Sequence, residues 1–314
     1  MSEKNLPPVA VIGGGGFGRA IATAAHRNGR DVILWSRSSG LNEPYKTTKE
    51  LADLRHSELL FLAVPSPYVP ETAAAIGRHL NGSHLLVHVS RGLLGEELMT
   101  LSQHLRKTTP CRRIGALAGP LDAEALRDGL PTGAIVGSRF PEVAVAVREA
   151  IGGSTLRIYE SRDVVGVEIA AAVVGLLALA AGYGRARGAS PATLSVFLTR
   201  GMNECTRIGV ALGAQAETFG GLAGFGDLMA VIGGDDRPEI RLGEALASGM
   251  DLAAAGAKAG AHIEGVSIAT RLVMFAERAG LEAPMARVVA AVLAGELRPE
   301  QAIDALMARR AGRE

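Results

Sequence analysis

A glycine-rich hexapeptide near the start of the chain has the composition of a phosphate-binding turn. It follows the apolar run Val9–Ile12 and precedes a segment with helical periodicity. In that context the first glycine allows a tight turn, the second lets the backbone approach a pyrophosphate, and the third allows close helix packing. The helix N-terminus adds free N–H groups and a positive dipole end. The motif therefore predicts a dinucleotide site formed by Gly13, Gly15, Gly16, Phe17 and Gly18, the alternative being a flexible turn.

The next apolar run, Val32–Trp35, ends in Ser36 and Arg37. Many NAD sites carry an acidic residue here that binds the ribose 2′-OH, but no acid follows this run before Glu43. An arginine can cap the adenine or pair with a 2′-phosphate. We therefore expect Ser36 and Arg37 to contact the cofactor, which is NADP or NAD. The alternative is a solvated loop arginine.

Two further apolar runs end in turns that would line the same cleft. Leu59–Val64 is followed by Pro65, which we expect to lie at the cofactor, and Leu85–Val89 is followed by Ser90. His88 shares a strand face with Ser90 by the period of two, and a histidine can act as a general acid near neutral pH. His88 is thus a candidate catalytic residue, and His262 a weaker one. The alternative for His88 is a packed or exposed histidine at a strand end.

The elements that must position these residues change character along the chain. In the first half, short apolar runs alternate with helical segments such as Arg19–Asn28 and Pro70–Leu80, which predicts a doubly wound parallel sheet. The predicted strands are Val9–Ile12, Val32–Trp35, Leu59–Val64, Leu85–Val89, Ile114–Leu117 and Ala134–Val136. Helical periods then dominate, over 164–187, 191–212, 239–248, 265–279, 283–295 and 299–310. We expect an α/β fold: an N-terminal Rossmann domain (residues 1–162), then an all-helical domain (residues 163–314).

Composition excludes several classes of protein. The 314 residues are 48% hydrophobic and 21% charged, with a formal net charge of +1, so we expect neither nucleic-acid nor membrane partners. The apolar stretch 169–184 is short for a membrane span and predicts a buried core helix. Cys111 and Cys205 lack metal-ligand spacing, which predicts no metal site and reduced thiols in a cytoplasmic protein. Apolar helices in the second half permit a homodimer.

Taken together, the motifs resemble bacterial-type NAD(P)-dependent glycerol-3-phosphate dehydrogenases over almost the whole chain. The matching segments are 13–18, 34–37, 62–66, 119–120 with 123–124, 129–132, 163–168, 199–202, 217–228 and 264–266. The resemblance implies reduction of dihydroxyacetone phosphate, a small-molecule substrate, to sn-glycerol 3-phosphate with NAD(P)H. It also implies that Glu264 lies near the cofactor and that Asp227 belongs to the catalytic group. Asp227 could instead bond within its glycine-rich loop, and Glu168 could merely position a helix.

The sequence departs from that family at its catalytic positions. The family's catalytic lysine and following asparagine correspond by ungapped counting to Val174 and Gly175, which supply no donor. The lysine of the family's Ser-Lys-Gly turn is Arg91, which keeps the charge but holds its proton too tightly for ordinary acid catalysis.

The family's threonine corresponds to Val231, and its Arg-Asn pair, which holds phosphate, corresponds to Pro238 and Glu239. Arg237 or Arg241 could compensate by a local shift. Two hypotheses follow: an NAD(P)-dependent oxidoreductase that is weak or has an altered substrate, or a non-catalytic dinucleotide-binding sensor, scaffold or partner subunit. Asp227, Arg91 and His88 are the catalytic candidates under the first.

Overall fold

The chain forms two compact units. The computed structural model describes residues 8–38, 42–234, 237–260, 264–298 and 301–302, with residues 264 and 265 described by their backbone alone. The first unit combines residues 1–91 with 99–168, and the second combines 92–98 with 169–314. The division thus falls inside one long helix, after Glu168.

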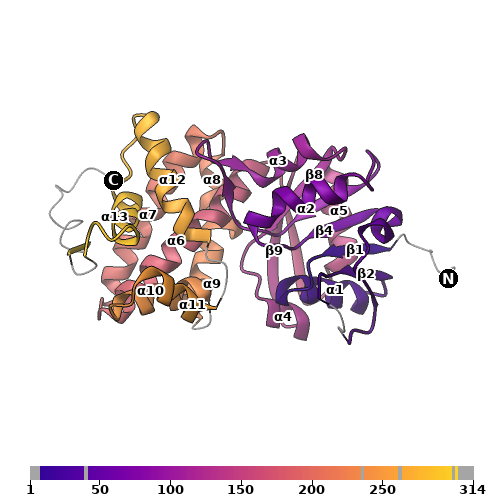
Figure 1. The fold of residues 1–314 in the computed structure, drawn as a ribbon, viewed down its shortest axis with the longest axis horizontal. Helices are drawn as coiled ribbons and strands as arrows, with labels where there is room; N and C mark the ends of the chain where they lie inside the picture. The colour runs from indigo at the N-terminus through magenta and orange to yellow at the C-terminus, as the bar shows by residue number, and fades with distance from the viewer. Residues whose placement is uncertain (1–7, 39–41, 235–236, 261–263, 299–300, 303–314) are drawn as a thin grey trace. The chain divides into compact units, whose positions relative to one another are not determined.

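The first unit is built on a sheet of eight strands (Figure 1). In spatial order these are β10 (Leu156–Ser161), β9 (Thr132–Ser138), β8 (Arg113–Ala118), β5 (Leu85–His88), β4 (Leu59–Leu62), β1 (Val9–Ile12), β2 (Val32–Trp35) and β3 (Lys46–Thr48). The strands β8, β5, β4, β1, β2 and β3 are mutually parallel. Because the chain order reverses beside β1, the crevice at its carboxyl end is where such sheets bind ligands.

Helices cover both faces of this sheet, which explains why the central strands are continuously apolar. One face packs against α1 (Gly16–Arg27), α4 (Ala123–Asp128) and α5 (Pro141–Ile151). On the other face, α2 (Val69–Gly77) packs against α3 (Leu101–Thr108) and the 3₁₀ helix η1 (Leu51–His56), and α3 contacts β8. A second 3₁₀ turn, η2 (Ser66–Tyr68), precedes α2, and the short strand β7 (Met99–Thr100) precedes α3. The short strand β6 (Leu93–Leu94) belongs to the second unit.

The predicted fold class is confirmed, with one correction at the sheet edge. The run Ala134–Val136 was expected to be a parallel strand, but β9 runs antiparallel to β8, with Gly115 opposite Ser138. An apolar run shows that a strand is buried without showing its direction, so the prediction was wrong on that point. β10, parallel to β9, was not predicted. Its exposed Arg157, Tyr159 and Glu160 dilute the apolar signal at the edge.

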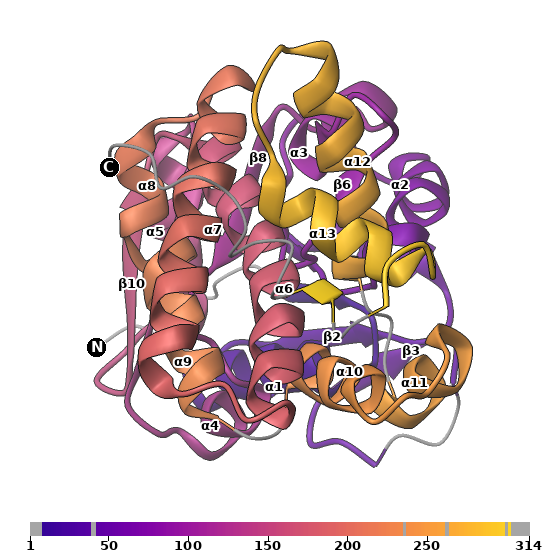
Figure 2. The ribbon, with the colours of Figure 1, turned by 90° about the vertical axis from the view of Figure 1, so that its left-hand side faces the viewer.

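The second unit is helical. Its elements are α6 (Val164–Ala186, which begins in the first unit), α7 (Pro191–Ala211), α8 (Ala216–Gly220), the π-helix η3 (Leu222–Gly226), α9 (Asp227–Gly233), α10 (Pro238–Ala247), α11 (Leu252–Ala259), α12 (Glu264–Arg278) and α13 (Pro284–Leu293). Figure 2 shows α6 and α7, the two longest helices among the described residues. The predicted helix 299–310 lies outside the described residues except for 301–302.

Burial stabilises α6, and a buried carboxylate caps α13. The α6 helix is long and apolar enough to cross a membrane, but 89% of its most apolar window is buried, as in a core helix. The N-terminus of α13 has no side-chain cap of its own. Instead the carboxylate of Glu204, on α7, accepts the N–H groups of Met285 and Ala286 at 2.9 Å each. This carboxylate therefore satisfies N–H groups that a helix start leaves without partners.

Candidate functional site

The turn between β1 and α1 needs glycine at two positions for steric reasons. Gly13 has φ of 124°, a conformation that L side chains rarely adopt, and a Cβ there would overlap the carbonyl oxygen of Ala63. A Cβ at Gly18 would overlap the carbonyl oxygen of Gly13. The first and third glycines of the motif thus make the turn and bring α1 against the end of β1.

Two of the glycines between them, Gly15 and Gly16, leave open space instead. A Cβ at Gly15 or at Gly16 would have no described atom within 4 Å. Gly15 is the N-cap of α1, and no side chain caps this 12-residue helix. The N-terminal N–H groups of α1 therefore face a cradle that a side chain would fill. A pyrophosphate fits such a cradle, because its charge matches the dipole end and its oxygens accept N–H groups.

Ser36 and Arg37 follow β2 at the same sheet edge. The Ser36 side chain is buried, and its Oγ accepts the N–H of Ser38 at 3.2 Å. Arg37 is exposed, and its guanidinium carbon lies 5.4 Å from the centre of the Tyr68 ring, within the range of a cation–π contact. Tyr68 was missed in the sequence. Its place shortly after the Val-Pro-Ser turn was the available signal.

A hydrogen bond links the turn after β4 to the turn after β5. Pro65 precedes η2, and the Ser90 hydroxyl donates to the carbonyl oxygen of Val64 at 2.6 Å. Arg91 follows Ser90 immediately. The structure therefore brings the ends of β1, β2, β4 and β5 to one sheet edge, where each predicted cofactor residue of the first unit lies. Glu264 was also predicted at the cofactor, but its side chain lies outside the described residues.

His88 lies in a buried hydrogen-bond network. Its side chain is 2% exposed, and its Nε2 is 2.9 Å from Oε1 of Glu168, which is itself 1% exposed. Glu168 also accepts the N–H of Ser102 at 2.8 Å and the Ser102 hydroxyl. The network links the last residue of β5, the start of α3 and the first turns of α6. Its geometry suits positioning of these three elements.

In the second unit, Asp227 begins α9 directly after the π-helix η3. The Asp227 side chain has no exposed surface, and its Oδ1 is 3.2 Å from Nη2 of Arg237. The Arg237 side chain is 22% exposed. A buried carboxylate needs a charged or hydrogen-bonding partner, and Arg237 supplies one from the residue that precedes α10. Arg241, the other predicted substitute, instead donates to the carbonyl oxygen of Ala259 at 3.0 Å.

The position of the family lysine is occupied by buried hydrocarbon. Val174 is fully buried in α6. A Cβ at the next residue, Gly175, would lie 3.6 Å from Oε1 of Glu239. A carboxylate from α10 therefore approaches the α6 backbone, in the absence of a side chain at Gly175. Pro238 is the first residue of α10 and offers no N–H, and Val231 is buried.

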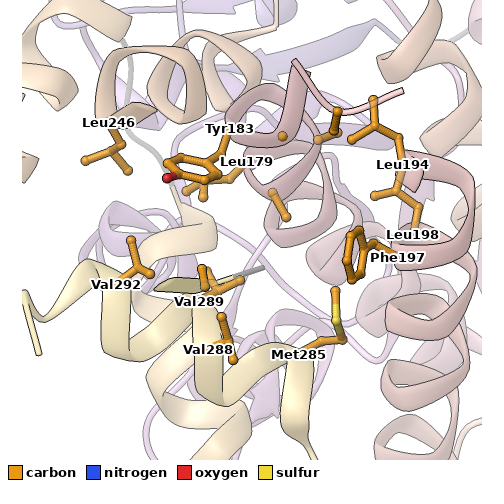
Figure 3. Close-up of a pocket in the computed structure, with 15 residues that line it drawn as sticks. Leu179, Tyr183, Leu194, Phe197, Leu198, Leu246, Met285, Val288, Val289 and Val292 are labelled. Atoms are coloured by element: carbon orange, nitrogen blue, oxygen red, sulfur yellow. The ribbon is translucent and has the colours of Figure 1, made fainter. Parts of the chain in front are cut away.

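The second unit also encloses an apolar cavity of about 80 Å³ (Figure 3). The labelled side chains point into it from α6, α7, α10 and α13, and Tyr183 carries the one oxygen among them. Its lining offers no charged donor to a phosphate ester among the described residues, so this cavity does not fit the substrates of the resembled family.

Comparisons with known proteins agree along the chain. Residues 8–53 and 45–144 match the family model for the N-terminus of NAD-dependent glycerol-3-phosphate dehydrogenase, and residues 163–304 match that for its C-terminus. Glycerol-3-phosphate dehydrogenase [NAD(P)+] of Ectopseudomonas mendocina is 33% identical, over 96% of this chain and 94% of the relative. The Geobacter sulfurreducens enzyme is also 33% identical, over 98% of each chain. The crystal structure of Coxiella burnetii glycerol-3-phosphate dehydrogenase superposes with a TM-score of 0.90 at 25% identity, over 97% of this chain and 100% of that one.

Proposed function

The chain belongs to the NAD-dependent glycerol-3-phosphate dehydrogenase family, whose members use NAD or NADP, and from this premise we propose a modified substrate site. The protein is an NAD(P)-dependent oxidoreductase. It reduces dihydroxyacetone phosphate weakly, or it acts on another small carbonyl or alcohol. The cofactor supplies or accepts the hydride when bound.

The approach of Glu239 to Gly175 is the observation that carries this proposal. These positions correspond to two asparagines of the resembled family, and here one is a carboxylate and the other has no side chain. A carboxylate repels a phosphate group, and the repulsion grows as water is excluded. The buried Val174 cannot protonate a developing alkoxide. Substrate phosphate and substrate oxygen therefore both lose their expected partners.

The remaining polar residues retain defined roles in the proposal. The N-terminus of α1 holds the cofactor pyrophosphate, and Arg37 stacked on Tyr68 faces the adenosine end. Arg91 supplies positive charge that stabilises an alkoxide without giving up its proton. Asp227, held by Arg237, orients groups at the substrate. His88 acts through the Glu168 network as a positioning residue, because its Nε2 is already engaged there.

The test is a steady-state assay of NADPH and NADH oxidation. Dihydroxyacetone phosphate is compared with unphosphorylated dihydroxyacetone and with carbonyl substrates that carry an ammonium group, which Glu239 would attract. Cofactor binding is first established by the quenching or enhancement of nicotinamide fluorescence. We expect kcat/KM for dihydroxyacetone phosphate at least about 10²-fold below the ordinary enzyme range of about 10⁴–10⁸ M⁻¹s⁻¹. Turnover within that range would contradict the proposal.

A second candidate function is a dinucleotide-binding protein without catalysis. It is favoured by the contrast between the open, uncapped α1 cradle and the buried hydrocarbon at Val174. Both candidates predict cofactor binding, and they separate on turnover. Binding of NADPH with no oxidation of the cofactor by any carbonyl in the panel would support the second candidate and exclude the first.

A further inference from the structure

A small pocket in the first unit carries three arginines on its rim, on the α3 side of the sheet. Arg106 comes from α3, Arg112 precedes β8, and Arg139 follows β9. The pocket holds about 100 Å³ and also includes Gln103 and Ser102. Its residues are separate from those of the glycine-rich turn and from Asp227. The proposed function involves it only through Ser102, which donates to Glu168.

The antiparallel pairing at the sheet edge creates this cluster. Because β9 runs opposite to β8, with Gly115 beside Ser138, the end of β9 meets the start of β8. The Ser138 hydroxyl donates to the carbonyl oxygen of Ile114 at 2.8 Å, which fixes this junction. Arg139 is therefore held near Arg112, although 26 residues of chain separate them.

The positive charge of this pocket is not neutralised by its own walls. Its lining includes no Asp or Glu within the portion of the chain that the structure describes. Arg112 donates to the carbonyl oxygens of Arg106 and Thr109 at 3.1 and 3.3 Å, and these bonds anchor its guanidinium. Arg106 and Arg139 are exposed, and neither side chain forms an ion pair with any described residue. Two exposed guanidinium groups thus line the pocket together with one anchored guanidinium.

The floor of the pocket is apolar, so the part of a ligand that lies beyond its anionic group should be apolar too. It consists of Ile114, Phe140, Val164 and Val165. A volume of about 100 Å³ is well below the roughly 300–1,000 Å³ of pockets that enclose whole small molecules. The pocket therefore suits a head group and the first apolar atoms attached to it. Guanidinium groups bind phosphate by paired N–H donors.

We propose that this arginine-rimmed pocket binds a phosphomonoester whose phosphate contacts Arg106, Arg112 and Arg139 and whose organic part rests on Phe140 and its apolar neighbours. Such a ligand would also touch the wall formed by Ser102. Ser102 donates to Glu168, which accepts from His88, so the pocket borders the network that holds the start of α6.

Phenyl phosphate is a suitable probe, titrated calorimetrically into the full chain with NADPH present to occupy the glycine-rich turn. We expect Arg139→Gln and Arg106→Gln each to raise Kd about tenfold or more. Arg78→Gln removes another exposed arginine of the same unit and should leave Kd unchanged. Arg237→Gln, in the other unit, should also leave it unchanged. Inorganic phosphate should bind more weakly than phenyl phosphate.

Several outcomes would overturn this site. One is the absence of phenyl phosphate binding to the wild-type chain at millimolar concentrations. Another is wild-type affinity in Arg139→Gln, or binding lost only in Arg237→Gln. Arg139→Lys keeps the charge but not the paired donors, so affinity between those of the wild type and Arg139→Gln supports guanidinium recognition. Thermal unfolding without ligand verifies that each variant is folded.

Discussion

Nη2 of Arg237 lies 3.2 Å from Oδ1 of Asp227, a carboxylate with no exposed surface. The pair connects the first residue of α9 to the residue that precedes α10. A buried charge whose partner is removed is left uncompensated, and this costs more than the loss of an exposed ion pair. By ungapped counting the arginine of the resembled family corresponds to Pro238, and the preceding residue, Arg237, is the one that supplies a cation to Asp227.

Replacement of that cation should reduce stability. We expect Arg237→Gln to lower the free energy of unfolding by about 1–3 kcal/mol, between the values for exposed and fully buried pairs. Arg271→Gln is the matched control, because Arg271 is a half-buried arginine of the same unit that donates to the neutral carbonyl oxygen of Leu93 at 2.6 Å, and its loss should cost about 1 kcal/mol or less. Urea denaturation measures both. Equal losses in the two variants would contradict the importance of the buried carboxylate.

Substitutions at two glycines of the glycine-rich turn should affect different properties, one cofactor binding and the other thermal stability. Gly15→Ala places a methyl group in open space at the N-terminus of α1, so the thermal midpoint should be unchanged while Kd for NADPH rises at least about tenfold. Gly18→Ala places it against the carbonyl oxygen of Gly13, so the midpoint should fall. Calorimetric binding and thermal unfolding provide the two measurements. An unchanged Kd in Gly15→Ala would place the pyrophosphate elsewhere.

The two cysteines should be unreactive in the native protein. Burial raises the pKa of the Cys205 thiol well above its ordinary value of 9.0, and burial likewise raises that of Cys111. The thiolate is the nucleophile, so alkylation by iodoacetamide at pH 8 should be slow in buffer and rapid in urea. Since the folded state keeps these protons, their stabilising contribution is complete below pH 9.0 and declines as the pH rises above it. Equal labelling rates in buffer and urea would contradict this.

The first-unit strands could be predicted because their signal is local. Val9–Ile12 and Val32–Trp35 have the predicted bounds, since a continuously apolar run followed by a glycine-rich or polar turn leaves few other structures. Strand direction at β9 and the existence of β10 could not be predicted from such runs. Direction depends on how the strand pairs with its neighbours in the sheet, and an apolar run carries no information on that pairing.

The candidate site shows the same limit. Gly13 and Gly18 could be assigned from the motif because each acts on adjacent backbone. The partner of His88 is Glu168, 80 residues away, and that of Asp227 is Arg237, 10 residues away and beyond the end of α9. The period of two predicts on which face of the strand a side chain lies, but it does not identify the hydrogen-bond partner of that side chain. His88 could therefore be assigned a face but not a partner.

The Glu168 network should matter for folding more than for proton transfer. Glu168→Gln keeps the shape but weakens the acceptance of three donors, from Ser102 and His88. We expect a loss of about 2–4 kcal/mol in the free energy of unfolding, from the weakened charged hydrogen bonds in a buried site. His88→Ala should lower stability while leaving the pH profile of any measured turnover unchanged. A lost ionisation in that profile would restore His88 as a general acid.

Reconstruction of the family residues tests how the substrate site was altered. The double change Val174→Lys and Gly175→Asn restores the two donors on α6, but it leaves the Glu239 carboxylate beside them. That carboxylate would pair with the new ammonium group and repel the substrate phosphate. We therefore expect little gain in kcat/KM for dihydroxyacetone phosphate from the double change alone.

Addition of Glu239→Asn removes the competing charge, so the triple variant should exceed the double variant at least about tenfold in kcat/KM. Glu239→Asn alone is the control and should gain little, because the buried Val174 still supplies no proton. Full recovery in the double variant would show that Glu239 does not obstruct the site. Equal, low activity in all three would place the defect beyond these residues, which favours the dinucleotide-binding protein without catalysis.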